Sequence, residues 1–508
     1  MANGLYDVIV VGAGPGGSAA AALLAQQGRR VLLLEKGTFP RDKVCGDLIS
    51  PRSLRVLAQL GCGPAVAAAA RNRLEGGLLY VNGEQFATAR IPGRDGLPTY
   101  GYAIPRLVFD EIVFRHAQAS GADTREGCHV EGLSFGEEVT VYARRGARYR
   151  GRLVIGADGA HSVVARALGM EQRESKQIIV ALRAYYEGVG GDPSQVDLFF
   201  DEQFFPGYGW IFHLGDGRAN VGLGMVQDVY KRYGINLRQR LDQWVADDPH
   251  AHARLGRGRL DGRIVGWPLP TFRRRGGNYA TRALLVGDAG SFVDPINGEG
   301  IHTALETAVI AAGVAAEALD AGDFSARFLS RYERRWREEL DLDLRTADLI
   351  VTVIQNRALN PLWMLLLGLI GQRADADTLY ADACGGMLAG VVPTHHSVSL
   401  PLAAKTLLQG PGPWRRALAG AEGRAAGGRP AAGALDAALT GSSQVLDAIS
   451  AMAAEPQHSL AWAWDVTRKS AGLARGLGDR YLLGTIRYMF GTAPADAGKE
   501  NPQWPKVK

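Results

Sequence analysis

The first 35 residues combine two apolar patterns with a glycine-rich turn between them. A run of consecutive apolar residues from Val8 to Val11 leads into the turn, small apolar residues at helical spacing follow, and "VLLL" precedes Glu35. Continuous apolar runs bounded by glycine are typical of strands that are buried on both faces. The pattern therefore predicts a strand, a turn, a helix and a second strand, which together form a βαβ unit.

Further along the chain the period of the apolar positions changes several times. Helical spacing is predicted for residues 107–119 and for the charged amphipathic stretch 325–355. Strands are predicted within 75–105, 128–168 and 178–225, where "GDGR" is the turn between two of the longer strands, and a strand, turn and helix within 283–318. Segments with a strand, a turn and a helix thus alternate with sheet-rich segments, which indicates one domain interrupted by another.

Composition excludes several classes of protein. The chain is 46% hydrophobic and 21% charged, with a net charge of +5, as expected of a folded soluble protein with no nucleic-acid partner. None of the cysteines (Cys45, Cys62, Cys128 and Cys384) has CxxC spacing, which predicts free thiols in the cytoplasm and no metal site. The longest apolar run, 359–370, is shorter than the ~18–20 residues of a membrane-spanning helix and predicts a core helix or an interfacial segment. Nothing in the sequence sets the oligomeric state.

The turn after the first strand has the G-x-G-x-x-G spacing at Gly12, Gly14 and Gly17. Gly12 permits the sharp turn, Gly14 lets the backbone approach a pyrophosphate, and Gly17 lets the helix pack on the strand. The helix N-terminus offers free N–H groups to the phosphates. Glu35, 23 residues after Gly12, can accept hydrogen bonds from ribose hydroxyls and repels a 2′-phosphate, so the motif predicts FAD or NAD rather than NADP.

Two later segments favour FAD. "GADGAHSVVAR" carries Asp158 and Gly159, and "ALLVGDAGSFVDPINGEGI" carries Asp288 at a strand end, before a helix that begins near Gly300. An aspartate there can accept a ribityl hydroxyl, and the helix N-terminus can stabilise negative charge on a reduced flavin. The predicted cofactor-binding residues in these segments are Gly12, Gly14, Gly17, Glu35, Lys36, Asp158, Gly159, Asp288, Pro295, Gly298, Gly300 and Ile301.

Taken together, these motifs resemble the group-A flavoprotein hydroxylase superfamily over about residues 5–410, and two segments resemble its geranylgeranyl reductase family. In residues 39–54 the matching positions are Lys43, Cys45, Gly46, Asp47, Pro51 and Arg52. In residues 206–224 Tyr208, Trp210 and Phe212 match, but His213 replaces the usual proline, a departure that bears on the shape of the cavity. The resemblance also implies that Arg106 lies beside the FAD, and it adds Cys45, Gly46 and Arg106 to the predicted cofactor-binding residues.

The resemblance implies an α/β fold, in which a glutathione-reductase-type Rossmann domain is interleaved with a mixed β-sheet domain and followed by helices. We expect five parts: a discontinuous FAD-binding domain (1–74, 106–170 and 271–345), a substrate-binding sheet domain (75–105 and 171–270), a helical region (346–419), a linker (420–435) and a helical basic tail (436–508).

Two sets of side chains are candidates for the chemistry. Tyr208, Trp210 and Phe212 alternate, so they share one face of a strand and form either a wall for a long apolar substrate or ordinary sheet core. Cys45 lies in a glycine-containing loop, where it is either a small buried residue or, as the resemblance implies, a catalytic thiol near the flavin.

The predicted function is an FAD-dependent reductase that saturates isolated C=C bonds of a prenyl chain on a lipid, quinone or tetrapyrrole. The alternatives are a flavin monooxygenase, or less readily a halogenase, that acts on a secondary metabolite, and a flavin-fold assembly module. The sequence has no second nucleotide fingerprint and does not identify the electron donor. The resemblance implies NAD(P)H or a reduced ferredoxin.

The C-terminal tail is basic and rich in apolar residues. Residues 468–508 contain eight Lys or Arg and three acidic residues, and Leu473, Leu477 and Leu482 are near helical spacing. A basic amphipathic helix can bind a membrane surface. It can equally pack its apolar face on the enzyme or bind a partner protein, and the sequence leaves these alternatives open.

Overall fold

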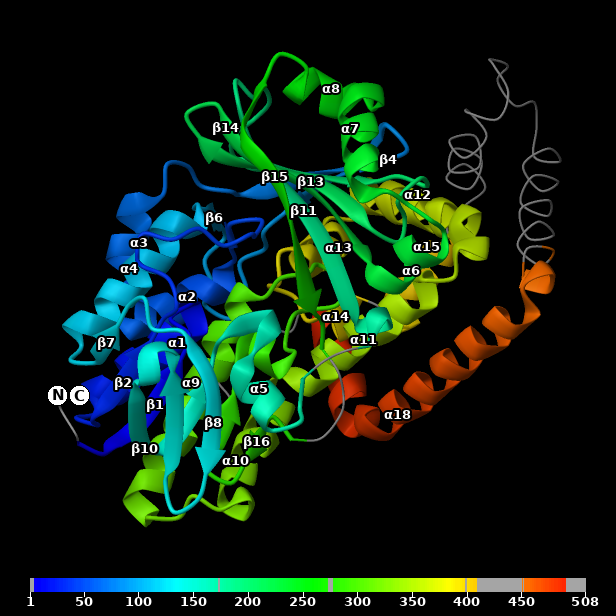
Figure 1. Ribbon diagram of the computed structural model, residues 1–508. Helices are drawn as coiled ribbons and strands as arrows, with labels where there is room; N and C mark the ends of the chain where they lie inside the picture. Colours follow the sequence, from blue (N-terminus) through cyan, green and yellow to red (C-terminus); the bar gives the residue numbers. More distant parts are fainter. Residues whose placement is uncertain are drawn as a thin grey trace, which may run out of the picture.

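The computed structural model describes residues 4–171, 174–272, 277–397, 400–408, 450 and 452–489. The predicted linker 420–435, and residues 436–449 and 490–508 of the predicted tail, lie outside the described residues. Two large sheets with their covering helices, a small two-stranded sheet and a group of C-terminal helices make up the described chain (Figure 1).

The first sheet has the strand order β16-β17-β10-β1-β2-β7, and the antiparallel strands β8 and β9 extend from β10. Strands β17, β10, β1, β2 and β7 run parallel. The strands are β1 (Tyr6–Val11), β2 (Val31–Leu34), β7 (Asp123–Arg125), β8 (Val130–Phe135), β9 (Val139–Ala143), β10 (Arg148–Gly156), β16 (Tyr279–Ala280) and β17 (Ala283–Leu285). The predicted βαβ unit is confirmed, with β1 and β2 paired from Val8 opposite Val31 onward.

Helices α1 (Pro15–Gln26), α4 (Arg106–Ala119) and α9 (Ile301–Ala321) cover one face of this sheet and share its largest core cluster. The alanines at 19–22 of α1 are fully buried, and small side chains let α1 lie close to α9. Shorter elements complete this part: β3 (Leu48–Ile49), β6 (Tyr102–Ala103), α2 (Pro51–Leu60), α3 (Gly63–Ala69) and α5 (Val163–Ala167).

The second sheet has the strand order β15-β11-β14-β13-β12-β4-β5 and is mostly antiparallel, with β12 and β4 parallel. Its strands are β4 (Gly76–Val81), β5 (Glu84–Arg90), β11 (Ile178–Glu187), β12 (Gln195–Phe200), β13 (Tyr208–Gly215), β14 (Arg218–Val226) and β15 (Arg259–Pro270). Helices α6 (Gln227–Arg232), α7 (Leu237–Asp247) and α8 (Pro249–Leu255) follow β14 in the chain, and α7 and α8 share a core cluster with one face of this sheet. The side chains of Asn236 and Asp248 cap α7 and α8.

The C-terminal helices begin with α10 (Ala326–Trp336), a π-helical turn (Arg337–Asp341) and α11 (Leu342–Ile354), which confirms the helical pattern of 325–355. They continue with α12 (Asn360–Ala376), α13 (Thr378–Leu388), α14 (Thr394–Ser397), α15 (Leu400–Leu407) and α18 (Pro456–Met489). Helices α12 and α13 pack against β5, and α18 lies along α11 (orange in Figure 1).

Among the described residues, no single helix is long and apolar enough to cross a membrane. The bent pair 326–354 and 357–376, with an angle of 78° between its halves, meets the length and composition test only when the two are taken together.

Candidate active site

A cavity of about 1250 Å³ lies between the two sheets and the C-terminal helices. Every predicted site residue except Gly17 lines it, including the three aromatic residues of β13. The structure therefore brings together segments that are far apart in the sequence, from Gly12 to Ile301.

The glycines of the first turn have different structural roles. Gly12 has φ +96°, and a Cβ there would lie 2.4 Å from the Ala157 carbonyl oxygen. A Cβ on Gly17 would lie 1.9 Å from the Gly12 carbonyl oxygen, so Gly17 sets the packing of α1 on β1 rather than lining the cavity. Gly14 faces open space, and no side chain caps the N-terminus of α1. Uncapped N–H groups beside such a gap fit a pyrophosphate.

Glu35 is 4% exposed and lies at the end of β2. Its Oε2 accepts a hydrogen bond from the Ala13 amide at 2.9 Å, and its Oε1 accepts one from the Gly37 amide at 2.9 Å. A carboxylate has about four acceptor positions, so these bonds fix its orientation and leave capacity for ribose hydroxyls. The neighbouring Lys36 lines the cavity and is exposed.

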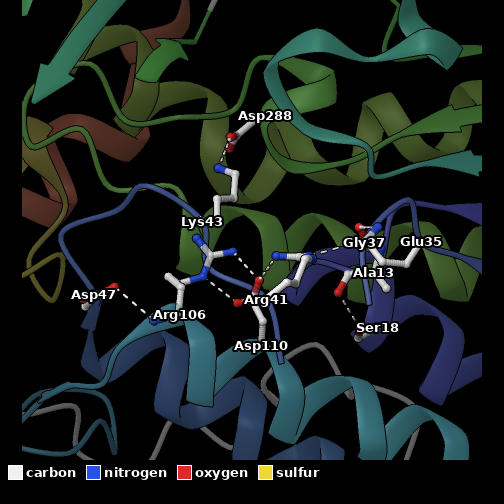
Figure 2. Close-up of polar contacts among 10 residues, drawn as sticks. All are labelled: Ala13, Ser18, Glu35, Gly37, Arg41, Lys43, Asp47, Arg106, Asp110 and Asp288. Carbon is white, nitrogen blue, oxygen red and sulfur yellow. Dashed lines mark hydrogen bonds and ion pairs between the residues drawn. The ribbon is translucent and has the colours of Figure 1, made fainter. Parts of the chain in front are cut away.

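A chain of ion pairs leads inward from Glu35 (Figure 2). Arg41 Nη2 lies 3.3 Å from Glu35 Oε2, and Arg41 Nη1 lies 2.9 Å from Asp110 Oδ2. Asp110 also accepts two hydrogen bonds from Arg106, at 2.5 and 2.8 Å. Burial lowers the pKa of Arg106, but Asp110 and the Cys45 side chain outweigh it, so the pKa is raised and the guanidinium stays charged. The sequence reasoning missed Arg41 and Asp110, although Asp110 lies four residues after Arg106 on α4, a spacing at which two side chains of a helix meet.

The other two motif segments lie beside this turn. Asp158 accepts hydrogen bonds from the Ser162 hydroxyl at 2.5 Å and the Val163 amide at 2.7 Å, and burial raises its pKa. Asp288 Oδ2 lies 3.3 Å from Lys43 Nζ, a pairing that the sequence reasoning did not foresee (Figure 2). Gly300 precedes α9, whose N-terminus has no side-chain cap. A second uncapped helix end beside an aspartate fits the flavin half of FAD.

The aromatic residues of β13 share one face, as predicted. The ring centroids of Tyr208 and Trp210 are 6.0 Å apart, and those of Trp210 and Phe212 are 6.1 Å apart. Gly222 on β14 makes room for the indole, because a Cβ there would lie 2.0 Å from Trp210 Cζ2. His213 points to the opposite face, where its Nε2 lies 3.8 Å from Asp197 Oδ2. It does not line the cavity, so the change from proline does not alter the cavity wall directly.

Asn220 joins this aromatic face to the loop that carries Cys45. Its Oδ1 accepts a hydrogen bond from Trp210 Nε1 at 3.0 Å, and its Nδ2 donates to the Cys45 carbonyl oxygen at 2.7 Å. The same Nδ2 lies 2.8 Å from Asp47 Oδ2, which also accepts from the Tyr185 hydroxyl at 2.7 Å. Burial raises the pKa of Asp47 to about 6. The sequence motif contained Asp47, but nothing in it indicated Asn220 or Tyr185.

The other end of the cavity is apolar and is formed by the C-terminal helices. Its lining side chains come from α11, α12, α13 and α15 and include Ile350, Ile354, Trp363, Leu366, Leu367 and Ile370. The run at 359–370, expected to be a core helix or an interfacial segment, lies in and just before α12, whose side chains form part of this wall.

Comparison with known proteins agrees with this geometry. A family profile described as an FAD binding domain matches residues 5–187. The menaquinone reductase of Mycobacterium tuberculosis (strain H37Rv) is 34% identical over 361 residues, which cover 68% of this chain and 84% of that protein. Digeranylgeranylglycerophospholipid reductase 2 of Methanopyrus kandleri is 34% identical over 384 residues, covering 70% of this chain and 89% of that protein.

Solved structures show the same fold. A geranylgeranyl bacteriochlorophyll reductase-like protein from Thermoplasma acidophilum superposes with a TM-score of 0.63 and 25% identity, over 80% of this chain and 96% of that one. A flavin-dependent brominase also has a TM-score of 0.63, over 80% of this chain, but at 21% identity it shares the fold alone. The interleaved α/β fold, the FAD-binding motifs and these relatives agree: the chain belongs to the geranylgeranyl reductase family of FAD-dependent oxidoreductases.

Proposed function

We propose that the protein saturates isolated C=C bonds in a prenyl chain carried by a lipid, a quinone or a tetrapyrrole. One observation supports this most: a single cavity joins the dinucleotide turn, the aromatic face of β13 and the apolar end beside α11 and α12. A long hydrocarbon chain fits such a space because its burial is favourable at about 25 cal/mol per Å² of apolar surface. The names of the relatives, a menaquinone reductase and a lipid reductase, point to substrates of the same class.

An isolated alkene is a poor hydride acceptor, so position and the exclusion of water must supply most of the rate. When bound, FAD supplies the hydride chemistry. The residues of this chain then have separable tasks: the turns at Gly14 and Gly300 hold the cofactor, and the aromatic face of β13 holds the substrate chain beside it. We assign residues 1–74, 106–170 and 271–345 to the FAD-binding domain and residues 75–105 and 171–270 to the substrate-binding domain, with the cavity between the two domains.

Cys45 is the candidate for a catalytic thiol, since it lines the cavity and its side chain lies beside the Arg106 guanidinium. We expect Cys45→Ser to lower the steady-state rate while FAD content and the unfolding midpoint stay unchanged. A variant with the normal rate would show that Cys45 is only a small packing residue.

The electron donor is NAD(P)H or a reduced ferredoxin. Bleaching of the yellow protein by NADH or NADPH under anaerobic conditions supports the nucleotide, and bleaching only by reduced ferredoxin supports the protein donor.

We also propose a cytoplasmic location with peripheral contact to a lipid surface. The four cysteines are free, as in a reducing compartment, and Leu460 and Trp464 of α18 are 71% and 69% exposed. Flotation of the full chain with anionic liposomes at low salt is expected, and the double variant Leu460→Gln, Trp464→Gln should float less. A full chain that does not float contradicts the proposal.

The proposed activity is tested with enzyme reduced by dithionite under anaerobic conditions and mixed with geranylgeranyl lipids or menaquinone. We expect the flavin to be reoxidised and the product to gain two hydrogen atoms per saturated bond by mass spectrometry. A reduced enzyme that no prenyl compound reoxidises, but that inserts oxygen into another substrate in air, would favour the monooxygenase alternative.

A further inference from the structure

Glu299 lies where the turn before α9 meets the aromatic face of β13. Its side chain is 6% exposed and lines the cavity. Within the described part of the chain, no backbone amide or hydroxyl donates to its carboxylate, and the close polar group is the His302 ring. The turn itself is fixed, because the Glu299 amide donates to Asn297 Oδ1 at 2.9 Å and its carbonyl accepts from the Asp294 amide at 3.0 Å. A buried carboxylate with so few donors is costly and calls for an explanation.

His302, three residues after Glu299 and in the first turn of α9, is the nearest titratable partner. Its Nδ1 lies 3.1 Å from Glu299 Oε2, and its side chain is 2% exposed. Burial lowers the pKa of His302, but the Glu299 carboxylate outweighs it, so the pKa is raised. The pair therefore favours a state in which one proton is held between the two residues.

A cluster of charged groups surrounds the pair. Arg52 on α2 binds both carboxylate oxygens of Glu306 at 2.9 and 2.6 Å and lies 3.6 Å from Asp343 on α11, and Arg55 lies 3.5 Å from Glu306. Four carboxyl groups (Glu299, Glu306, Asp294 and Asp343) thus share the region with two guanidinium groups and His302. Carboxylates so close together cannot all ionise at low cost. In keeping with this, burial and the Asp343 charge raise the pKa of Asp294 to about 6.

We propose that Glu299 gives the alkene its proton and that His302 supplies that proton to Glu299. This inference rests on the proposed function. In the reaction the C=C π bond breaks, and one carbon gains a hydride and its electron pair with the reduced flavin as reductant. The proton held by the pair moves from the His302 imidazolium to the Glu299 carboxylate and from there to the other carbon. This leaves an ionised Glu299 beside a neutral His302, and a proton from water restores the pair. Glu299 is a catalytic residue in this scheme, and His302 is a positioning residue.

The neighbouring phenol is a weaker candidate for the acid. Tyr208 donates its hydroxyl hydrogen to the Asn297 carbonyl oxygen, and burial and the Glu299 charge raise its pKa. The hydroxyl hydrogen of Tyr208 is therefore already in a hydrogen bond, and its raised pKa makes the hydrogen harder to release as a proton. Glu299 has neither restriction, and it lies in the turn that joins the predicted flavin site to α9.

The test compares Glu299→Gln with Glu317→Gln, a matched change near the C-terminal end of α9, where Glu317 pairs with Arg331 and Arg335 at the surface. FAD content and reduction by dithionite are expected to be unchanged in both variants. Anaerobic reoxidation of the reduced flavin by a geranylgeranyl lipid should slow by about 100-fold or more in Glu299→Gln only, the usual contribution of a general acid. Glu299→Asp should recover part of the rate.

Two further readouts separate proton donation from a structural role. The wild-type reoxidation rate should fall as the pH rises and the pair loses its proton, and Glu299→Gln should lose that dependence. Infrared difference spectra of the wild type between a pH at which the pair holds its proton and a pH at which it does not should contain Glu299 carboxylate and His302 imidazole bands that are absent or shifted in Glu299→Gln, whether or not substrate is present. Glu299→Gln with the wild-type rate and pH profile overturns the assignment while the proposed function stands. A wild-type enzyme that no prenyl compound reoxidises overturns the proposed function, and the assignment with it.

Discussion

The two ends of the cavity are built in different ways. At the nucleotide end, a short segment around β1, α1 and β2 provides a turn, a helix N-terminus and Glu35, and charged side chains continue inward through Arg41, Asp110 and Arg106. At the apolar end, the wall is assembled from α11, α12, α13 and α15, which contribute aliphatic and aromatic side chains with few polar atoms. A dinucleotide needs donors and charges at fixed positions, whereas a hydrocarbon chain needs only dry volume. The first end is therefore sensitive to single atoms, and the second to total size.

The largest expected effect comes from the glycines of α1. Gly17→Val places a side chain within 1.9 Å of the Gly12 carbonyl oxygen, so we expect insoluble or unfolded protein. Gly14→Val extends into open space at the cavity, so we expect a soluble protein that purifies without its yellow colour. Expression, circular dichroism and flavin content distinguish the two outcomes. Copurification of Gly14→Val with stoichiometric FAD would show that the pyrophosphate binds elsewhere.

Asp110→Asn tests the charged interior of the nucleotide end. It leaves the buried guanidinium groups of Arg41 and Arg106 without their shared carboxylate. Removing one partner of a buried ion pair costs about 3–5 kcal/mol in the free energy of unfolding, measured by urea denaturation. The control is Glu131→Gln, whose exposed pair with Arg144 should change the free energy of unfolding by less than about 1 kcal/mol. If the two changes lowered the free energy of unfolding equally, the burial of the Asp110 ion pairs would not matter to stability, and the prediction would be wrong.

Leu367→Ala tests the apolar end. The side chain lines the cavity on α12, and burying a leucine contributes about 1.5–3 kcal/mol, so prenyl-substrate binding should weaken roughly tenfold or more. FAD affinity, measured by fluorescence titration, should not change. Leu107→Ala, at an exposed position of α4, is the matched control. Weaker FAD binding in Leu367→Ala, with normal substrate binding, would show that FAD binds at the apolar end of the cavity and would contradict the assignment of the two ends.

Lys469→Met should have the smallest effect. Lys469 joins α18 to the outer side of α11 through Asp348 and the Thr352 hydroxyl, each at 2.7 Å. We expect local opening of α18, measured by hydrogen exchange, to become easier by about 1.5 kcal/mol, the lower end for hydrogen bonds that involve a charged group. Arg468→Met, at a mostly exposed neighbour, is the control. Exchange unchanged in both variants would mean that α18 does not depend on this contact.

The described part of the basic tail shows a feature that the sequence pattern did not determine, namely which apolar side chains of α18 face the protein. Trp462 donates to the Thr352 carbonyl oxygen at 2.9 Å, and Leu473 is 8% exposed, so this stretch of α18 packs on the enzyme. Leu460 and Trp464 on the same helix remain largely exposed. The apolar pattern predicted a helix with apolar positions, but it did not indicate which of them face the protein. Membrane contact stays a prediction.

The sequence by itself determined the features that local geometry governs. The turn requires a glycine at position 12, where φ is +96°, and the packing of α1 on β1 requires one at position 17, so the spacing of the glycines is visible in the sequence. Likewise, Tyr208, Trp210 and Phe212 share a face simply because β13 is a strand. Only the tertiary structure decided that Asn220 holds the Trp210 indole, that Asp110 also pairs with Arg41, and that α12 helps to close the apolar end. These contacts join residues that the chain separates widely or that no spacing marks. Their partners are chosen by the packing of whole elements, which minimises exposed apolar surface and unpaired buried charge.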